Sequence, residues 1–122
     1  MAFVLRWSEP VLTMQEGDDS WTAYVELVND SDADAEIGGG PAATAVIRNA
    51  DGTSVRRRSS MLVAIPSVLI HYRLGPREAR PLRVVVGLAP DDLAKLPAGR
   101  YRIRQVQWGE LTAPDIDLEV RA

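Results

Sequence analysis

The 122-residue chain contains no cysteine, and this absence removes several kinds of chemistry at once. Without a thiol, the protein has no disulfide, no thiolate nucleophile and no cysteine ligand for zinc. A domain of this length buries about two-thirds of its unfolded surface, so it needs neither a disulfide nor a metal to fold. The lack of cysteine also suits a reducing compartment. We therefore expect residues 1–122 to form a single domain in the cytoplasm.

Long apolar runs are absent as well. The longest, MLVAIPSVLI, is interrupted by Pro66 and Ser67, and about 20 apolar residues are needed to cross a bilayer. The first residues lack the basic start, the apolar stretch and the small-residue cleavage site of a signal peptide. These features also predict a cytoplasmic protein, and one that does not bind membranes.

Histidine occurs only once, at His71, which limits the sites that the chain can assemble. No serine lies in a G-x-S-x-G motif, and no second histidine exists to complete a metal pair. We therefore expect His71 to be a half-exposed strand residue. The sequence also shows no phosphate-binding loop, dinucleotide fingerprint or catalytic carboxylate pair. It predicts a protein that is not an enzyme and has no catalytic residue, cofactor or metal.

The acidic stretch DSDADAE, residues 30–36, invites comparison with a calcium loop. An EF-hand loop that began at Asp30 would need glycine and glutamate where this chain has Ala35 and Pro41. The stretch is then a solvated turn and edge strand whose charges discourage edge-to-edge pairing. A calcium loop of another type is the alternative.

A basic surplus is also missing, since the net charge is -3. Three consecutive arginines nevertheless follow the turn signal Asp51-Gly52: Arg56, Arg57 and Arg58. They suit a solvated or edge-blocking strand, a patch for an acidic protein surface, or a nucleic-acid contact. The acidic balance and the lack of nearby aromatic residues disfavour nucleic acid.

What the chain does have is apolar and polar alternation with period two, which is typical of strands that are buried on one face. Strands are predicted at 3–7, 10–14, 21–29, 42–49, 53–58, 61–65, 67–73, 81–87, 101–108 and 115–121. Glycine, proline and Asn-Asp clusters separate them, with Gly38–Pro41 expected as a bend. One short helical turn is predicted near residues 91–96, with Asp91 or Asp92 as its cap.

The alternation slips by one residue in YRIRQVQW. Tyr101 and Ile103 share a face, but the next apolar residues are Val106 and Trp108. A β-bulge near residues 104–105 would produce this slip. The alternative is a strand that passes from the environment of one sheet to that of another.

The three tryptophans, Trp7, Trp21 and Trp108, all lie on predicted strands. Aromatic side chains serve both cores and interfaces. The phase of its strand places Trp21 in the core, whereas an exposed Trp7 or Trp108 would mark a contact site.

Four stretches together resemble bacterial intracellular proteinase inhibitors of the BsuPI type: YVELVNDSD, IRNADGTSVRRRS, YRLGPRE and LPAGRYRIRQVQW. The resemblance covers about residues 22–108. It implies a small immunoglobulin-like sandwich and the inhibition of a protease. No inhibitory residue is carried over.

From these features we expect an all-β, immunoglobulin-like (fibronectin-like) sandwich of seven to nine strands. Its expected function is non-catalytic binding of another protein, or self-association such as a homodimer, through a sheet face or edge. The expected contact residues are Arg56, Arg57, Arg58 and Trp108. Two alternatives are protease inhibition and a small barrel that binds an apolar ligand or acts as a cyclase-like enzyme. The barrel would need a pocket of about 300 Å³ or more.

Overall fold

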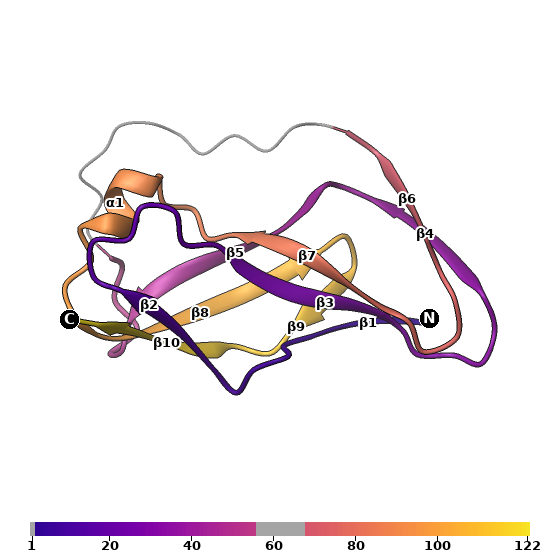
Figure 1. Ribbon diagram of the computed structural model, residues 1–122, viewed down its shortest axis with the longest axis horizontal. Helices are drawn as coiled ribbons and strands as arrows, with labels where there is room; N and C mark the ends of the chain where they lie inside the picture. The colour runs from indigo at the N-terminus through magenta and orange to yellow at the C-terminus, as the bar shows by residue number, and fades with distance from the viewer. Residues whose placement is uncertain (1, 56–67) are drawn as a thin grey trace.

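The computed structural model describes residues 2–55 and 68–122. The arginine triplet Arg56–Arg58 and the predicted strand 61–65 lie outside the described residues. Within them, the elements are β1 (Phe3–Arg6), β2 (Val11–Gln15), β3 (Ala23–Asn29), β4 (Ala35–Gly39), β5 (Ala42–Asn49), β6 (Ile70–Leu74), β7 (Ala79–Val85), α1 (Pro90–Ala94), β8 (Gly99–Trp108), β9 (Leu111–Ala113) and β10 (Ile116–Arg121). The prediction of an all-β fold is confirmed (Figure 1), but the described residues already contain ten strands, more than the seven to nine expected.

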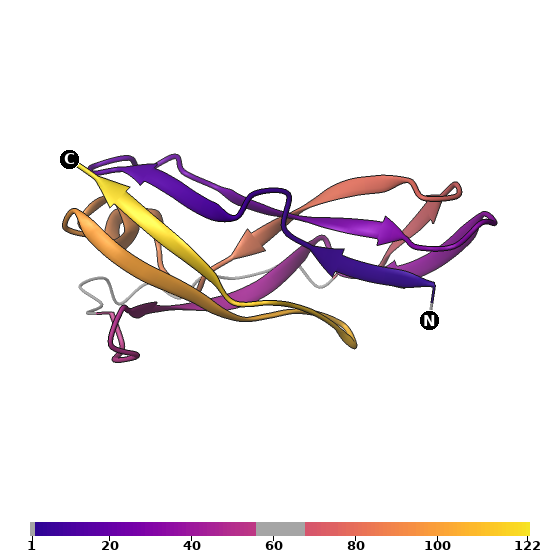
Figure 2. The ribbon, with the colours of Figure 1, turned by 90° about the horizontal axis from the view of Figure 1, so that it is seen from below.

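Most strands belong to one curled, mixed sheet. Its order is β1-β3-β7-β5-β8-β10-β2, and β9 pairs with the second half of β8. The pairs β5–β7 and β2–β10 are parallel, and the other pairs are antiparallel. Strands β4 and β6 form a separate antiparallel ribbon. Because β1 and β2 follow each other in the chain yet stand at opposite ends of the order, the sheet folds back on itself (Figure 2).

The core lies inside this curl and follows the predicted alternation. Val25 and Leu27 of β3, Ile103 of β8 and Leu118 of β10 are each 0% exposed. Most intervening residues of the same strands are exposed or half-buried, although Val28 at the end of β3 is also buried. The apolar set of each strand therefore faces the same interior, which is the main source of stability for such a sheet.

The slip in β8 is a β-bulge, as one of the two interpretations predicted. Gln105 has a positive φ of 56°. Thr44 is opposite Gln107, whereas Val46 is opposite Arg104, so β8 carries one extra residue against β5. The bulge restores the inward orientation of the residues that follow it.

The predicted turn at Asp51-Gly52 forms a hairpin. The Asn49 amide donates to the Thr53 carbonyl at 2.9 Å, and Gly52 adopts a φ of 89°. The hydroxyl and the amide of Thr53 donate to the Asp51 carboxylate, and they hold the pKa of that carboxyl below its ordinary value. The returning chain bridges to β5 at Ser54.

The helical turn begins one residue earlier than predicted. Pro90 occupies a first-turn position, where its missing N–H costs nothing, and the N-cap is Ala89 without a side-chain hydrogen bond. The prediction that Asp91 or Asp92 caps the helix is wrong, because both residues lie within its first turn. No helix among the described residues is long and apolar enough to cross a membrane.

Candidate functional site

Trp108, an expected contact residue, lies in the core instead. Its side chain is only 4% exposed and packs edge-on against Tyr72, with ring centroids 5.4 Å apart. Its indole N–H donates to the Gly40 carbonyl at 2.9 Å, and the Tyr72 hydroxyl donates to the same oxygen at 3.3 Å. The bulge in β8 turns Trp108 inward together with Val106, which is also buried. The prediction that Trp108 contacts a partner from an exposed position is therefore wrong.

Glycine allows this ring to approach the backbone. A Cβ at Gly39 would lie 2.2 Å from Cζ2 of Trp108, so no other residue fits there without displacing the indole. The predicted bend at Gly38–Pro41 is shorter than expected: Gly38 and Gly39 pair with β6 as part of β4, and only Gly40 and Pro41 connect β4 to β5. We refer to Gly39, Gly40, Tyr72 and Trp108 as the aromatic clasp. Because Tyr72 lies on β6 and Trp108 on β8, the clasp joins the β4–β6 ribbon to the main sheet.

The half-buried Trp7 also has a structural role. Its indole N–H donates to the Pro114 carbonyl at 2.7 Å, across 107 residues of sequence. Pro114 lies between β9 and β10, whereas Trp7 follows β1. The bond therefore links the start of the chain to a segment with which β1 does not pair.

The acidic stretch 30–36 forms ion pairs with two arginines. Two side chains pair with its carboxylates: Arg77 with Asp30 at 2.6 Å and Asp32 at 3.0 Å, and Arg73 with Glu36 at 3.9 Å and Asp34 at 4.0 Å. The described residues contain no group of three or more His, Asp or Glu side chains that could hold a metal. His71 is exposed on β6. The stretch thus matches the solvated-turn interpretation better than a calcium loop.

Asn29 is a structural residue that the sequence did not single out. It is 0% exposed, and its amide nitrogen donates to the carbonyls of Ala33, Leu74 and Gly75 at 2.8–3.0 Å. Its side-chain oxygen accepts the Ser31 hydroxyl at 2.7 Å. The buried Asn29 side chain thereby holds the acidic turn against the turn between β6 and β7. The role of Asn29 is therefore structural.

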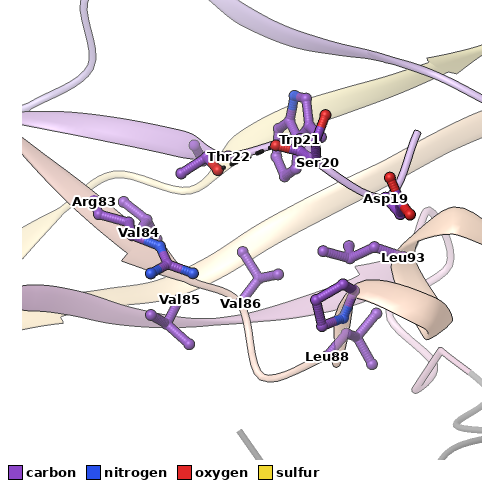
Figure 3. A pocket seen from close by; sticks show the side chains of 12 residues that line it. Asp19, Ser20, Trp21, Thr22, Arg83, Val84, Val85, Val86, Leu88 and Leu93 are labelled. Carbon is purple, nitrogen blue, oxygen red and sulfur yellow. Dashed lines mark hydrogen bonds between the residues drawn. The ribbon is translucent and has the colours of Figure 1, made fainter. Parts of the chain in front are cut away.

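Trp21 is a half-buried residue that lines two depressions in the surface. Its indole N–H donates to the Thr13 carbonyl at 2.9 Å. The phase of its strand predicted a core position, but the side chain is only partly buried against the core. It lines a depression of about 230 Å³ (Figure 3). It also lines one of about 330 Å³ together with residues of β2, Asp18 and Arg121. We call the 230 Å³ space the Trp21 depression.

Apolar side chains form the floor of the Trp21 depression. Val86 follows the end of β7, Leu88 lies beyond the turn at Gly87, and Leu93 comes from α1. These three apolar side chains are 5–7% exposed. Gly87 adopts a φ of 77°, which reverses the chain toward the helix at a position that favours glycine. The depression therefore lies between the start of β3, the end of β7 and the helix α1.

Two charged residues border the depression, Arg83 from β7 and Asp19 from the segment before β3. Figure 3 shows them on opposite sides, with Val86 and Leu93 between them. Neither forms an ion pair with another described residue, whereas seven other arginines do: Arg6, Arg73, Arg77, Arg80, Arg102, Arg104 and Arg121. Arg83 is thus a cation left without an internal counterion in the described part of the chain.

Tyr24 extends this surface along β3. Its side chain is 53% exposed, and it is directly opposite Arg83 in the β3–β7 ladder. We call Trp21, Tyr24 and Arg83, with the depression beside them, the Trp21 surface. Tryptophan, tyrosine and arginine are the residue types most enriched at the energetic centres of protein interfaces.

Comparison with protein-family models, curated proteins and solved structures finds no match to this chain. Its function must therefore be inferred from its own surface chemistry. The Trp21 surface combines exposed aromatic area, a depression with an apolar floor and unneutralised charge, and it is the strongest candidate site among the described residues.

Proposed function

We propose that the chain is a non-catalytic protein-binding module that contacts its partner through the Trp21 surface. The observation that carries this proposal is that Trp21 and Arg83 line one depression and that Tyr24 lies directly opposite Arg83 on the neighbouring strand. Side chains of these types contribute most when a partner excludes water from around them. The partner is another protein or a second copy of the chain.

The size of the depression favours a protein surface over a small ligand. Sites for small molecules usually enclose about 300–1,000 Å³, and the Trp21 depression has about 230 Å³. Other depressions among the described residues, one beside Tyr101 and one beside Glu16, have about 310 and 390 Å³. They stand at the low end of that range, as does the second depression beside Trp21, of about 330 Å³. No tryptophan or arginine occurs among the described residues that line the depressions beside Tyr101 and Glu16.

We also propose that the curled sheet is an immunoglobulin-like sandwich. In the constant-type arrangement, strands A, B and E belong to one sheet, and C, F and G belong to the other. The groups β1-β3-β7 and β5-β8-β10 have the corresponding chain order and neighbours. The parallel contact of β5 with β7 links the two groups on one side. A fold of this class often serves recognition, and this analogy supports the proposed function.

The proposal is tested by affinity purification from an extract of the cells that make the protein. The bait is wild type, Tyr24→Ser, or the control Thr112→Ser, which changes an exposed residue of β9. We expect a stoichiometric partner with wild type and control, and its loss with Tyr24→Ser. Equal recovery with all three baits would show that binding occurs elsewhere. If the partner is a protease, a stoichiometric inhibition assay decides whether binding means inhibition.

A further inference from the structure

We infer that the Trp21 depression receives an apolar side chain of the partner, flanked by an acidic group on one side and a basic group on the other. This inference rests on the proposed function and specifies the chemistry of the partner segment. It follows from the floor of the depression together with the charges at its two sides.

The floor selects an apolar side chain. Val86, Leu88 and Leu93 present carbon atoms, and the Trp21 ring forms a wall that is fixed by its bond to the Thr13 carbonyl. A shallow space of about 230 Å³ suits one aliphatic side chain better than a larger molecule. Covering this space removes apolar surface from water, which favours binding.

The two charged residues beside the depression, Arg83 and Asp19, favour opposite charges on the partner segment. The cross-strand neighbours of Arg83 are Tyr24 and Ala42, so its own ladder supplies no carboxylate. Asp19 is on the opposite side, next to Asp18 in the chain. Asp18 accepts hydrogen bonds from the amide and the hydroxyl of Ser20 at 2.9 and 2.8 Å, and it lines the other depression beside Trp21. Complementary charges at such positions orient a partner and reject the wrong one.

An extended segment presents alternate side chains toward the same surface. In an extended chain, residues i, i+2 and i+4 point to the same side. The probes are therefore four acetylated and amidated pentapeptides with leucine in the centre and alanine at the second and fourth positions. Their outer residues are aspartate and lysine, two aspartates, two lysines, or asparagine and glutamine. The readout is the NMR shift of the Trp21 indole N–H, which Trp21→Phe identifies among the three tryptophans.

We expect the aspartate–lysine peptide to bind most tightly, by about 2- to 5-fold for each charged group over the neutral peptide, as exposed ion pairs give. Arg83→Glu should transfer the preference to the two-lysine peptide, and Asp19→Lys should transfer it to the two-aspartate peptide. Thr112→Ser should behave as wild type does.

Three results would overturn the inference. The first is equal affinity for all four peptides, or no shift of the Trp21 indole with any of them. The second is a preference that Arg83→Glu leaves unchanged. The third is tighter binding of free leucine than of the aspartate–lysine peptide, which would indicate a small zwitterionic ligand. If Tyr24→Ser still abolishes capture of the partner, these results refute the partner chemistry alone. If Tyr24→Ser retains the partner, the proposed function itself fails.

Discussion

Trp108 and Trp21 make the same hydrogen bond but have different surroundings. Each indole N–H donates at 2.9 Å to a backbone carbonyl, Gly40 for Trp108 and Thr13 for Trp21. The Trp108 ring is then covered by the aromatic clasp and is 4% exposed. The Trp21 side chain is instead half-buried and lines two depressions.

The comparison shows that a tryptophan ring can be fixed in position without being covered by the protein. The indole–carbonyl bond anchors both rings, and what covers the rest of each ring decides its role. A covered ring contributes burial and packing to stability. A ring held in place but left open offers a partner a rigid apolar contact at little cost in entropy. We therefore expect Trp108 to govern stability and Trp21 to govern binding.

The largest expected effect comes from truncating the two rings. Trp108→Ala should lower the free energy of unfolding by about 3–5 kcal/mol, because it removes a fully buried aromatic side chain. The loss of free energy of unfolding in Trp21→Ala should be smaller than in Trp108→Ala by at least about 1 kcal/mol, because much of the Trp21 ring is not buried. Urea denaturation of both variants measures the difference, and equal losses would contradict the comparison.

A smaller effect is expected from adding one methyl group beside the clasp. Gly39→Ala places a Cβ 2.2 Å from Trp108 and should cost about 1–3 kcal/mol of stability through overpacking. Gly38→Ala is the matched control on the same strand, since its Cβ would meet its nearest neighbour, Leu69 Cδ1, at 3.4 Å. Thermal unfolding should separate the two variants clearly. Similar melting temperatures would mean that the indole moves aside freely.

The clasp should also make the protein sensitive to alkaline pH. Burial raises the pKa of Tyr72 above 10.0, and burial followed by the charge of Glu16 does the same for Tyr101. The unfolded chain therefore loses these protons first, so stability is fully present below pH 10 and falls as the pH rises above it. Melting temperatures between pH 8 and 11 measure this fall. Tyr72→Phe should make it less steep, and an unchanged slope would contradict the assignment to Tyr72.

The smallest effect on stability is expected at Arg83. Arg83→Gln removes no ion pair among the described residues, so the free energy of unfolding should change by less than about 0.5 kcal/mol. Its affinity for the partner should nevertheless decrease. The matched control is Arg104→Gln, which breaks the contact with Asp115 at 3.2 Å and should cost up to about 1 kcal/mol. Partner affinity measured by calorimetry should be unchanged for this control.

Local patterns in the sequence were sufficient for much of the fold. Period-two alternation located most strands, the phase slip located the bulge at Gln105, and Asp51-Gly52 located a hairpin. Strands β4 and β9 were missed because AEIGG and LTA are short and carry no clear alternation. These two segments form strands because they pair with neighbouring strands, and not because of the preference of their own residues.

The candidate site could not be predicted in the same way, because it depends on distant contacts. The burial of Trp108 depends on a glycine 69 positions earlier and on the bond to Gly40, 68 residues away. The openness of Trp21 depends on where β7 ends and where α1 crosses. The lack of a counterion for Arg83 can be recognised only from the folded structure, because the folded structure shows which carboxylates pair with the other arginines. The triplet Arg56–Arg58 stays a prediction, since it lies outside the described residues.

The most direct test of the central claim is site-specific photo-crosslinking in the native cells. A photoreactive p-benzoylphenylalanine replaces Tyr24 on β3 in one variant and Thr112 on β9 in the other. Our account predicts one defined crosslinked protein, or a crosslinked dimer of the chain, from position 24 and none from position 112. Crosslinks of equal yield from both positions, or a defined product from position 112 alone, would contradict it.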